Sequence, residues 1–150
     1  MNTSPMSAQK IAEFEGIHLS PYSDISGNAT VGVGHLLHKG PLNGTEKSIT
    51  KDQALVLFSA DLISKAEVFV SRIKTPLNQN QFDALVSFCY NLGAGHLAGL
   101  VSDTGLDKGR YDLVPSELLK YNKSRVHGAL VTVPGLIRRR QWEAMLFTRS

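Results

Sequence analysis

The segment "FDALVSFCYNLG", residues 82–93, most limits how this chain can fold. At helical spacing it is apolar nearly all round, and a helix of that kind must be buried on every side. Asn78, followed three residues later by Gln81, matches the capping pattern for its start, and Gly93 and Gly95 favour its end. We therefore expect this helix to be the core of a helical lobe.

Two further helices are predicted upstream. The first spans about residues 6–15, with Gly16 placed to end it. The second starts after Thr50, which forms a capping box with Gln53, and runs over about 51–74, before Pro76. Its apolar residues recur at steps of three and four: Leu55, Phe58, Leu62, Ala66, Phe69 and Ile73.

Between these helices, from Ile17 to about Leu37, turn-forming pairs and apolar alternation predict short antiparallel strands. Glycines and prolines leave no clear period over residues 96–115, and the local fold of 97–110 stays open. Short helices are expected near 116–123 and 136–147. A chain of 150 residues is one ordinary domain, here α+β. It would consist of a β-rich sub-lobe at 17–50, a connecting helix at 51–74 and a helical sub-lobe at 1–16 plus 76–150.

Composition narrows the functional classes. The single cysteine, Cys89, excludes an intrachain disulfide, and its apolar neighbours indicate a buried thiol. The sequence contains no run of about 18 apolar residues, so no membrane span is predicted. Residues 1–10 lack the apolar stretch of a secretory signal peptide. The net charge of +3, with arginines at 138–140, favours an anionic partner, unless these charges only solvate a helix face.

Two acidic residues stand near the exit of the first predicted helix: Glu15 at its end and Asp24 in the turn-forming sequence that follows. They come from different elements, so they can face one another without touching. Glycoside hydrolysis needs such a pair, with one protonated carboxyl for the leaving oxygen and one carboxylate for water or the sugar. The alternative is a solvated helix residue and a turn residue bonded to its own backbone.

Three groups of residues carry a resemblance to a known family: Glu15-Gly16, then Tyr22-Ser23-Asp24, then "TVGVGH" from Thr30. Eight residues separate the acids and five separate Asp24 from Thr30. The pattern resembles that of phage-type lysozymes (endolysins) of glycoside hydrolase family 24. Similarity continues through "TKDQALVLFSAD", "PLNQNQFDALVSFCYNLGAG" and "GLIRRRQWEAMLF", from about residue 8 to 148.

The resemblance implies a lysozyme-like fold, with the active-site cleft between a small β-hairpin lobe and a larger helical lobe. It implies a muramidase that cuts the β-1,4 bond between N-acetylmuramic acid and N-acetylglucosamine during host lysis. Glu15 would be the general acid, Asp24 the carboxylate that holds the attacking water, and Thr30 a partner of that water. Inversion would place the carboxyls roughly 6.5 to 9.5 Å apart. No cofactor or metal is implied.

Further residues follow from the same resemblance. Leu36, Tyr90 and Asn91 would line the saccharide site, although Tyr90 also suits a core aromatic and Asn91 a helix-end partner. His35 and Asp61 would form a structural ion pair. The sequence departs from many relatives after "NLG", which leaves any substrate contact of residues 97–110 open.

Two other functions remain open. His35 and His38 form a His-x-x-His pair that, with His18, would suit a zinc amidase, but no third ligand stands at a convincing spacing. A catalytically silent, basic cell-wall-binding module is the other alternative. Nucleic acid is not expected, since no motif accompanies the arginine run, whose members would brace carboxylates such as Glu143 or meet the cell wall.

For a phage-type lysozyme, peptidoglycan is the expected substrate. We expect a monomer that is not stably inserted in a membrane, accumulates in the host cytoplasm, and reaches the periplasm or cell wall after a holin opens the inner membrane. The sequence leaves open the host, the peptidoglycan chemotype, a hydrolase or transglycosylase outcome, and the role of the basic C-terminal helix.

Overall fold

Two structural units make up the chain in the computed structural model, which describes residues 1–150. The sheet unit is Pro5–Ser64, and the helical unit joins Met1–Ser4 to Lys65–Ser150. Thr3 ties the first residues to the helical unit, because its N–H and hydroxyl donate to Glu67 at 2.8 and 2.6 Å. The first helix, expected with the helical sub-lobe, belongs instead to the sheet unit.

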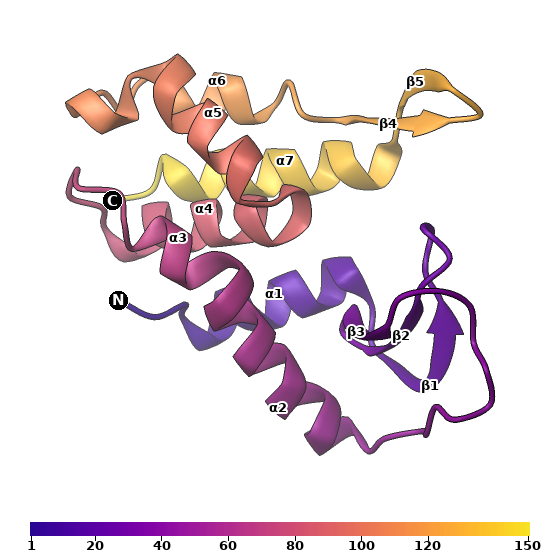
Figure 1. Ribbon diagram of the computed structural model, residues 1–150. Helices are drawn as coiled ribbons and strands as arrows, with labels where there is room; N and C mark the ends of the chain where they lie inside the picture. The colour runs from indigo at the N-terminus through magenta and orange to yellow at the C-terminus, as the bar shows by residue number, and fades with distance from the viewer. The chain divides into compact units, whose positions relative to one another are not determined.

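The sheet unit contains a three-stranded antiparallel sheet in the order β1-β2-β3 (Figure 1). All residues of the central strand, β2, are buried, and α2 packs against the sheet. The approach is close at Gly32, where a Cβ would lie 3.5 Å from the side chains of Ala54 and Ile49. The elements are α1 (Pro5–Glu15), β1 (His18–Ser23), β2 (Ala29–Gly32), β3 (His35–His38) and α2 (Lys51–Leu62).

The predicted start of α2 is confirmed. Thr50 Oγ1 accepts a hydrogen bond from the Gln53 N–H at 3.1 Å, and Gln53 Oε1 accepts one from the Thr50 N–H at 2.9 Å. The prediction of one helix over 51–74 is wrong, because a π-helical turn, Ile63–Glu67, separates α2 from the short α3 (Val68–Val70). A π turn inserts a residue without requiring glycine or proline, so apolar spacing did not reveal it.

The helical unit is organised around α4 (Gln79–Leu92), whose residues from Phe82 to Cys89 are all buried. Helices α3, α5 and α7 pack against it, which confirms its place in the core. Asn78 caps α4 and Gln81 completes the capping box, as predicted. The remaining elements are α5 (Ala94–Thr104), a 3₁₀ turn (Leu106–Lys108), α6 (Val114–Leu118), β4 (Lys123–Val126), β5 (Ala129–Thr132) and α7 (Pro134–Phe147).

Two of these elements differ from expectation. Residues 94–104 form a regular helix although they include Gly95 and Gly99, because Leu97 and Leu100 are buried on one side of it. The β4–β5 hairpin was not predicted. It turns through His127 and Gly128, which both have positive φ, as a type I′ turn requires.

None of the helices combines the length and the apolar character needed to cross a bilayer.

Replacing the capping residue of α2 should destabilise the protein measurably. Thr50→Ala removes the side-chain oxygen that accepts from Gln53, and we expect a loss of about 1 kcal/mol in the free energy of unfolding. Urea denaturation of Thr50→Ser, which keeps the hydroxyl, is the control and should lie near wild type. Equal stabilities of the alanine and serine variants would contradict this role for the cap.

Candidate active site

Glu15 is the last residue of α1 and is half-buried. The helix ends there because Gly16 takes φ 80° while its N–H still donates to Ala12 at 2.9 Å. A Cβ at Gly34, in the turn between β2 and β3, would lie 3.9 Å from Glu15 Oε2. The glycine turn therefore lies beside the carboxylate, with room that a larger residue would reduce.

Asp24 stands at the start of the turn between β1 and β2. Its Oδ1 accepts hydrogen bonds from the N–H groups of Ser26 and Asn28, both at 2.9 Å. Its own N–H donates to the Asn28 carbonyl at 3.0 Å, and the Gly27 N–H donates back to the Asp24 carbonyl at 2.9 Å. The turn thus fixes one carboxylate oxygen with two backbone donors.

Thr30 follows on β2 and is 3% exposed. Its hydroxyl donates to the Asn28 carbonyl at 2.9 Å. Because that proton is committed to the protein, the oxygen can act toward a third group only as an acceptor.

Tyr22 is influenced by the charges of both Glu15 and Asp24. The sequence did not single it out as a functional residue. Burial raises the pKa of its phenol, and the charges of Glu15 and Asp24 raise it further. The phenol therefore lies within electrostatic reach of both acids and stays protonated near neutral pH. Its ring centroid lies 4.4 Å from that of His18.

His35 and Asp61, the expected ion pair, lie close together. His35 Nδ1 on β3 is 2.7 Å from Asp61 Oδ2 on α2. The contact joins the sheet to the helix that covers it.

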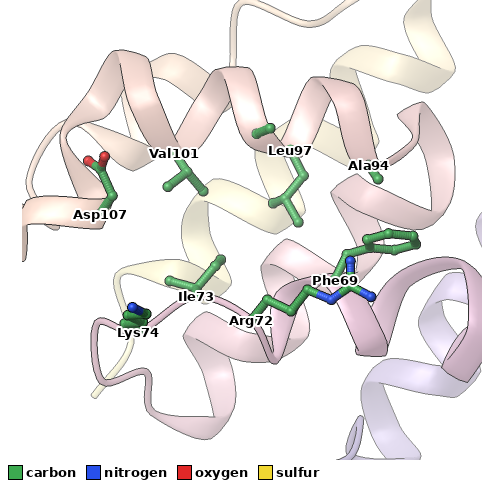
Figure 2. A pocket seen from close by; sticks show the side chains of 9 residues that line it. Phe69, Arg72, Ile73, Lys74, Ala94, Leu97, Val101 and Asp107 are labelled. Atoms are coloured by element: carbon green, nitrogen blue, oxygen red, sulfur yellow. The ribbon is translucent and has the colours of Figure 1, made fainter.

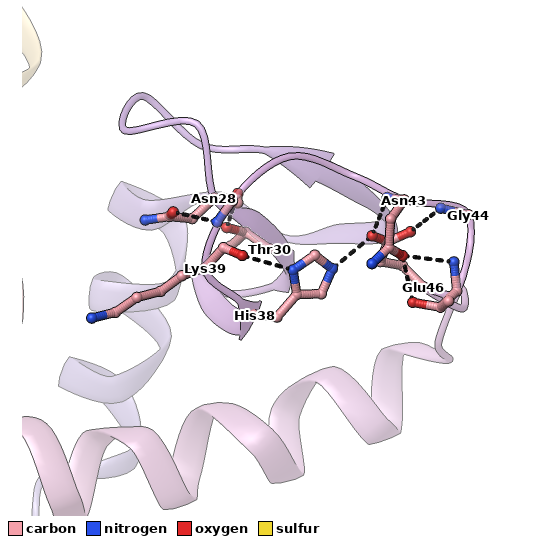
Figure 3. Close-up of polar contacts among 9 residues, drawn as sticks. Asn28, Thr30, His38, Lys39, Asn43, Gly44 and Glu46 are labelled. Carbon is pink, nitrogen blue, oxygen red and sulfur yellow. Dashed lines mark hydrogen bonds and ion pairs between the residues drawn. The ribbon is translucent and has the colours of Figure 1, made fainter.

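His38 has a different carboxylate partner, Glu46. Its Nε2 lies 2.8 Å from Glu46 Oε1, and its Nδ1 lies 3.0 Å from the Lys39 carbonyl (Figure 3). The Lys39 carbonyl and then Glu46 raise the pKa of His38. The Asn43 N–H, with further help from His38 and the Gly44 N–H, lowers the pKa of Glu46 to about 2.

The remaining predicted residues lie in two places. Leu36 is on β3 in the sheet unit and is partly exposed. Tyr90 and Asn91 are on the last turn of α4 in the helical unit. The Lys65 ammonium lies 5.8 Å from the centre of the Tyr90 ring. Asn91 Oδ1 accepts a hydrogen bond from Arg140 Nη2 at 2.7 Å, so its amide is held in one orientation.

The expectation that the arginine run braces carboxylates such as Glu143 is confirmed for two of its three members. Arg139 and Arg140 are buried on α7, where Arg140 Nε lies 2.7 Å from Glu143 Oε1 and Arg139 Nε lies 3.6 Å from Oε2. Ser87 of α4 donates to Glu143 Oε2 at 2.5 Å. Burial raises the pKa of Glu143, and the two guanidiniums and the hydroxyl oppose that rise.

The three histidines considered for zinc have separate neighbours: the His18 ring is tilted against the ring of Tyr22, His35 contacts Asp61, and His38 contacts Glu46. No group of three or more His, Cys, Asp or Glu side chains is arranged to hold a metal ion. The donor set expected of a zinc amidase is therefore not assembled.

A groove of about 400 Å³ in the helical unit is lined by other residues than the predicted ones (Figure 2). Phe69, Ile73, Leu97 and Val101 give it an apolar lining, to which Arg72, Lys74 and Asp107 add charges. None of the predicted site residues lines it, so the groove is not the candidate active site.

A chain with a small sheet unit and a helical unit, in which the sheet unit carries two acids and an acceptor hydroxyl, has the form of an acid–base glycosidase of lysozyme-like fold. A model of the family described as phage lysozyme matches residues 12–143. An endolysin of Acyrthosiphon pisum secondary endosymbiont phage 1 is 33% identical over 149 residues, which cover 98% of each chain.

Two solved structures are similar to this chain in both sequence and fold. The endolysin from Escherichia coli O157:H7 phage FAHEc1 is 32% identical, with a TM-score of 0.81 and coverage of 99% of this chain and 94% of that one. The muramidase domain of SpmX from Asticaccaulis excentricus is 28% identical, with a TM-score of 0.84 and coverage of 99% of each chain. The chain belongs to the phage lysozyme family and is a glycoside hydrolase that degrades peptidoglycan in host lysis.

The contact between His38 and Glu46 should make stability depend on pH. The raised pKa of His38 means that its contribution is complete below 6.5 and is lost as the pH rises through the folded-state value. The lowered pKa of Glu46 means that its contribution is present above 4.5 and is lost as the pH falls toward about 2. The summed contribution of His38 and Glu46 to stability is therefore largest between pH 4.5 and pH 6.5, the ordinary pKa values of the two groups.

Thermal melts of wild type and His38→Gln across this range provide the measurement. We expect the difference between their melting temperatures to be greatest between pH 4.5 and 6.5, the ordinary pKa values of the two groups. His127→Asn, at an exposed turn that asparagine tolerates, is the control and should follow the wild-type profile. A constant difference between wild type and His38→Gln would rule out the pair as its source.

Proposed function

We propose that the protein hydrolyses the β-1,4 bond between N-acetylmuramic acid and N-acetylglucosamine with inversion. Glu15 acts as the general acid and donates its proton to the glycosidic oxygen. Asp24 acts as the general base and takes a proton from water, whose oxygen attacks C1 of N-acetylmuramic acid. The bond from C1 to the leaving oxygen breaks as the new C1–O bond forms, and solvent restores both carboxyl groups afterwards.

The hydrogen bonding of the turn supports this division of roles more than any other observation. Backbone donors occupy Asp24 Oδ1, and no group of the protein donates to Oδ2. The Thr30 proton is used on the Asn28 carbonyl. Asp24 Oδ2 and Thr30 Oγ1 are thus two acceptors suited to the two hydrogens of one water, which leaves a lone pair of that water for C1.

Saccharide binding is proposed for Leu36, Tyr90 and Asn91. Leu36 offers exposed apolar area from β3. Asn91 offers an amide whose oxygen Arg140 already engages, which favours donation from its nitrogen to a carbonyl of the substrate. Tyr90 offers a ring beside Lys65.

Host lysis is proposed to follow release of a monomeric enzyme from the host cytoplasm through a holin. The family resemblance supports both points. Expression alone should leave cells intact, and addition of a membrane-permeabilising agent should lyse them. Prompt lysis without the agent would argue against holin-dependent access, and sedimentation of the purified protein above the mass of one chain would argue against a monomer.

Glu15→Gln should retain the fold and lose turnover by about 10²- to 10⁴-fold, because glutamine keeps the shape and lacks the proton. The measurement is release of reducing ends from purified peptidoglycan. Glu13→Gln is a matched control on the same helix, since Glu13 is exposed and its carboxylate contacts Lys10 and Gln9 of that helix. Near-wild-type turnover of a folded Glu15→Gln protein would exclude Glu15 as the acid.

Asp24→Asn should also lose most activity, because the amide cannot take a proton from water. Thr30→Ala should lose about 5- to 10-fold, the equivalent of one hydrogen bond of about 1 kcal/mol. A Thr30→Ser variant restores the hydroxyl and should recover most of the rate. If Thr30→Ala is as active as Thr30→Ser, the water contact proposed for Thr30 does not exist.

Product analysis separates this function from its alternatives. New reducing sugar in the presence of a chelator is expected, whereas chelator-sensitive amine release would indicate an amidase and binding without products would indicate a wall-binding module. NMR of the first product should show the α-anomer if hydrolysis inverts. Mass spectrometry showing anhydro-N-acetylmuramic acid would indicate a transglycosylase instead.

A further inference from the structure

Asn28 connects both residues of the proposed water site through its backbone. Its N–H donates to Asp24 Oδ1 at 2.9 Å. Its carbonyl accepts from the Asp24 N–H at 3.0 Å and from the Thr30 hydroxyl at 2.9 Å. One peptide segment therefore sets the direction of the Asp24 carboxylate and the rotation of the Thr30 hydroxyl.

The Asn28 side chain joins this segment to the loop that follows β3. Its Oδ1 accepts a hydrogen bond from the Gly40 N–H at 2.9 Å, and the neighbouring Ala29 N–H donates to the Gly40 carbonyl at 3.0 Å. Gly40 presents both groups from φ 89°, a conformation that side chains other than glycine rarely adopt. Two bonds in opposite directions thus hold the turn against the loop.

The loop of residues 39–46 has its own support. Glu46 accepts hydrogen bonds from the N–H groups of Asn43 and Gly44 at 2.7 and 2.9 Å, and it also contacts His38 (Figure 3). The Asn28 side chain therefore binds a loop whose conformation is stabilised by the Glu46 carboxylate. This bond anchors the exposed turn between β1 and β2 to a second segment of the chain.

We propose that Asn28 is a positioning residue for the hydrolysis, whose side-chain bond to Gly40 holds Asp24 and Thr30 in the geometry that binds and orients the attacking water. This role rests on the functions proposed for Asp24 and Thr30. Any residue at position 28 supplies a backbone N–H and carbonyl. Only a side chain with an acceptor at that distance, asparagine or aspartate, also reaches Gly40.

The effect should appear in kcat and not in KM. Asp24 and Thr30 act on water during bond cleavage, whereas the saccharide is bound by other residues, so a misplaced turn weakens the transition state more than the substrate complex. We expect Asn28→Ala to lower kcat about 10-fold or more on soluble, uncrosslinked peptidoglycan chains, with KM changed by less than about 3-fold.

Three comparisons identify the cause. Asn28→Asp keeps the acceptor and should retain kcat within about 3-fold, whereas Asn28→Gln moves the acceptor by about one C–C bond, about 1.5 Å, and should resemble Asn28→Ala. Asn43→Ala is the matched control. Asn43 caps its own loop by accepting from the Thr45 N–H and hydroxyl at 3.0 and 2.6 Å, without a bond to the catalytic turn. It should lose melting temperature but not kcat.

Several results would overturn the role of Asn28. A folded Asn28→Ala or Asn28→Gln enzyme with wild-type kcat would do so, as would a loss shared equally by Asn43→Ala or a change confined to KM. If neither variant folds, Asn28→Asp decides, since loss of its kcat contradicts the acceptor role. The Asp24→Asn variant distinguishes failure of this inference from failure of the proposed function. If Asp24→Asn is inactive and Asn28→Ala has wild-type kcat, only the role of Asn28 is wrong. If Asp24→Asn is fully active, the proposed role of Asp24 is wrong as well.

Discussion

Glu143 is a carboxylate without exposed surface, and the packing of the helical unit depends on how its charge is satisfied. Two guanidiniums of its own helix and the Ser87 hydroxyl of α4 surround it. A buried charge is strongly destabilising unless it is paired and hydrogen-bonded, so these contacts favour this packing of α7 on α4 over any that would leave the carboxylate unpaired. The same cluster reaches Asn91 through Arg140. Asn91, which is expected to bind the substrate, is thus oriented by Arg140, which also pairs with the buried Glu143.

The sheet unit solves a related problem with backbone donors. Asp24 is half-buried, and two N–H groups of its own turn bind one of its oxygens. Such donors belong to the main chain and cannot rotate away, so the carboxylate stays in place without a cationic partner that would compete for its charge. Glu46 is held in the same manner by the Asn43 and Gly44 N–H groups. Both carboxylates take their geometry from tight turns, which explains why glycines and asparagines crowd this part of the chain.

Features that act over a few residues were predictable, and those that depend on distant partners were not. The capping boxes of α2 and α4 were predicted because donor and acceptor lie three residues apart. The core position of α4 followed from its composition. The burial of Arg139 and Arg140 did not, because it depends on Ser87, 52 residues away from Arg139 in sequence. Asn28 looked like an ordinary turn residue, since its partner Gly40 is brought near only by the pairing of β2 with β3. The intervals between Glu15, Asp24 and Thr30 became meaningful through family resemblance, while Tyr22 emerged only from its electrostatic relation to both acids.

All three catalytic candidates belong to the sheet unit, and the chemistry proposed for them gives a physical reason. Proton transfer and attack by water require atoms to be placed within a fraction of an ångström, whereas a saccharide held by several contacts tolerates more variation. Hydrogen bonds between neighbouring segments of one unit can supply the first kind of precision, and this is the role proposed for the bonds of Asn28. Tyr90 and Asn91 lie in the helical unit, where the task proposed for them is binding. The geometry proposed for the water site therefore depends on local turns of the sheet unit alone.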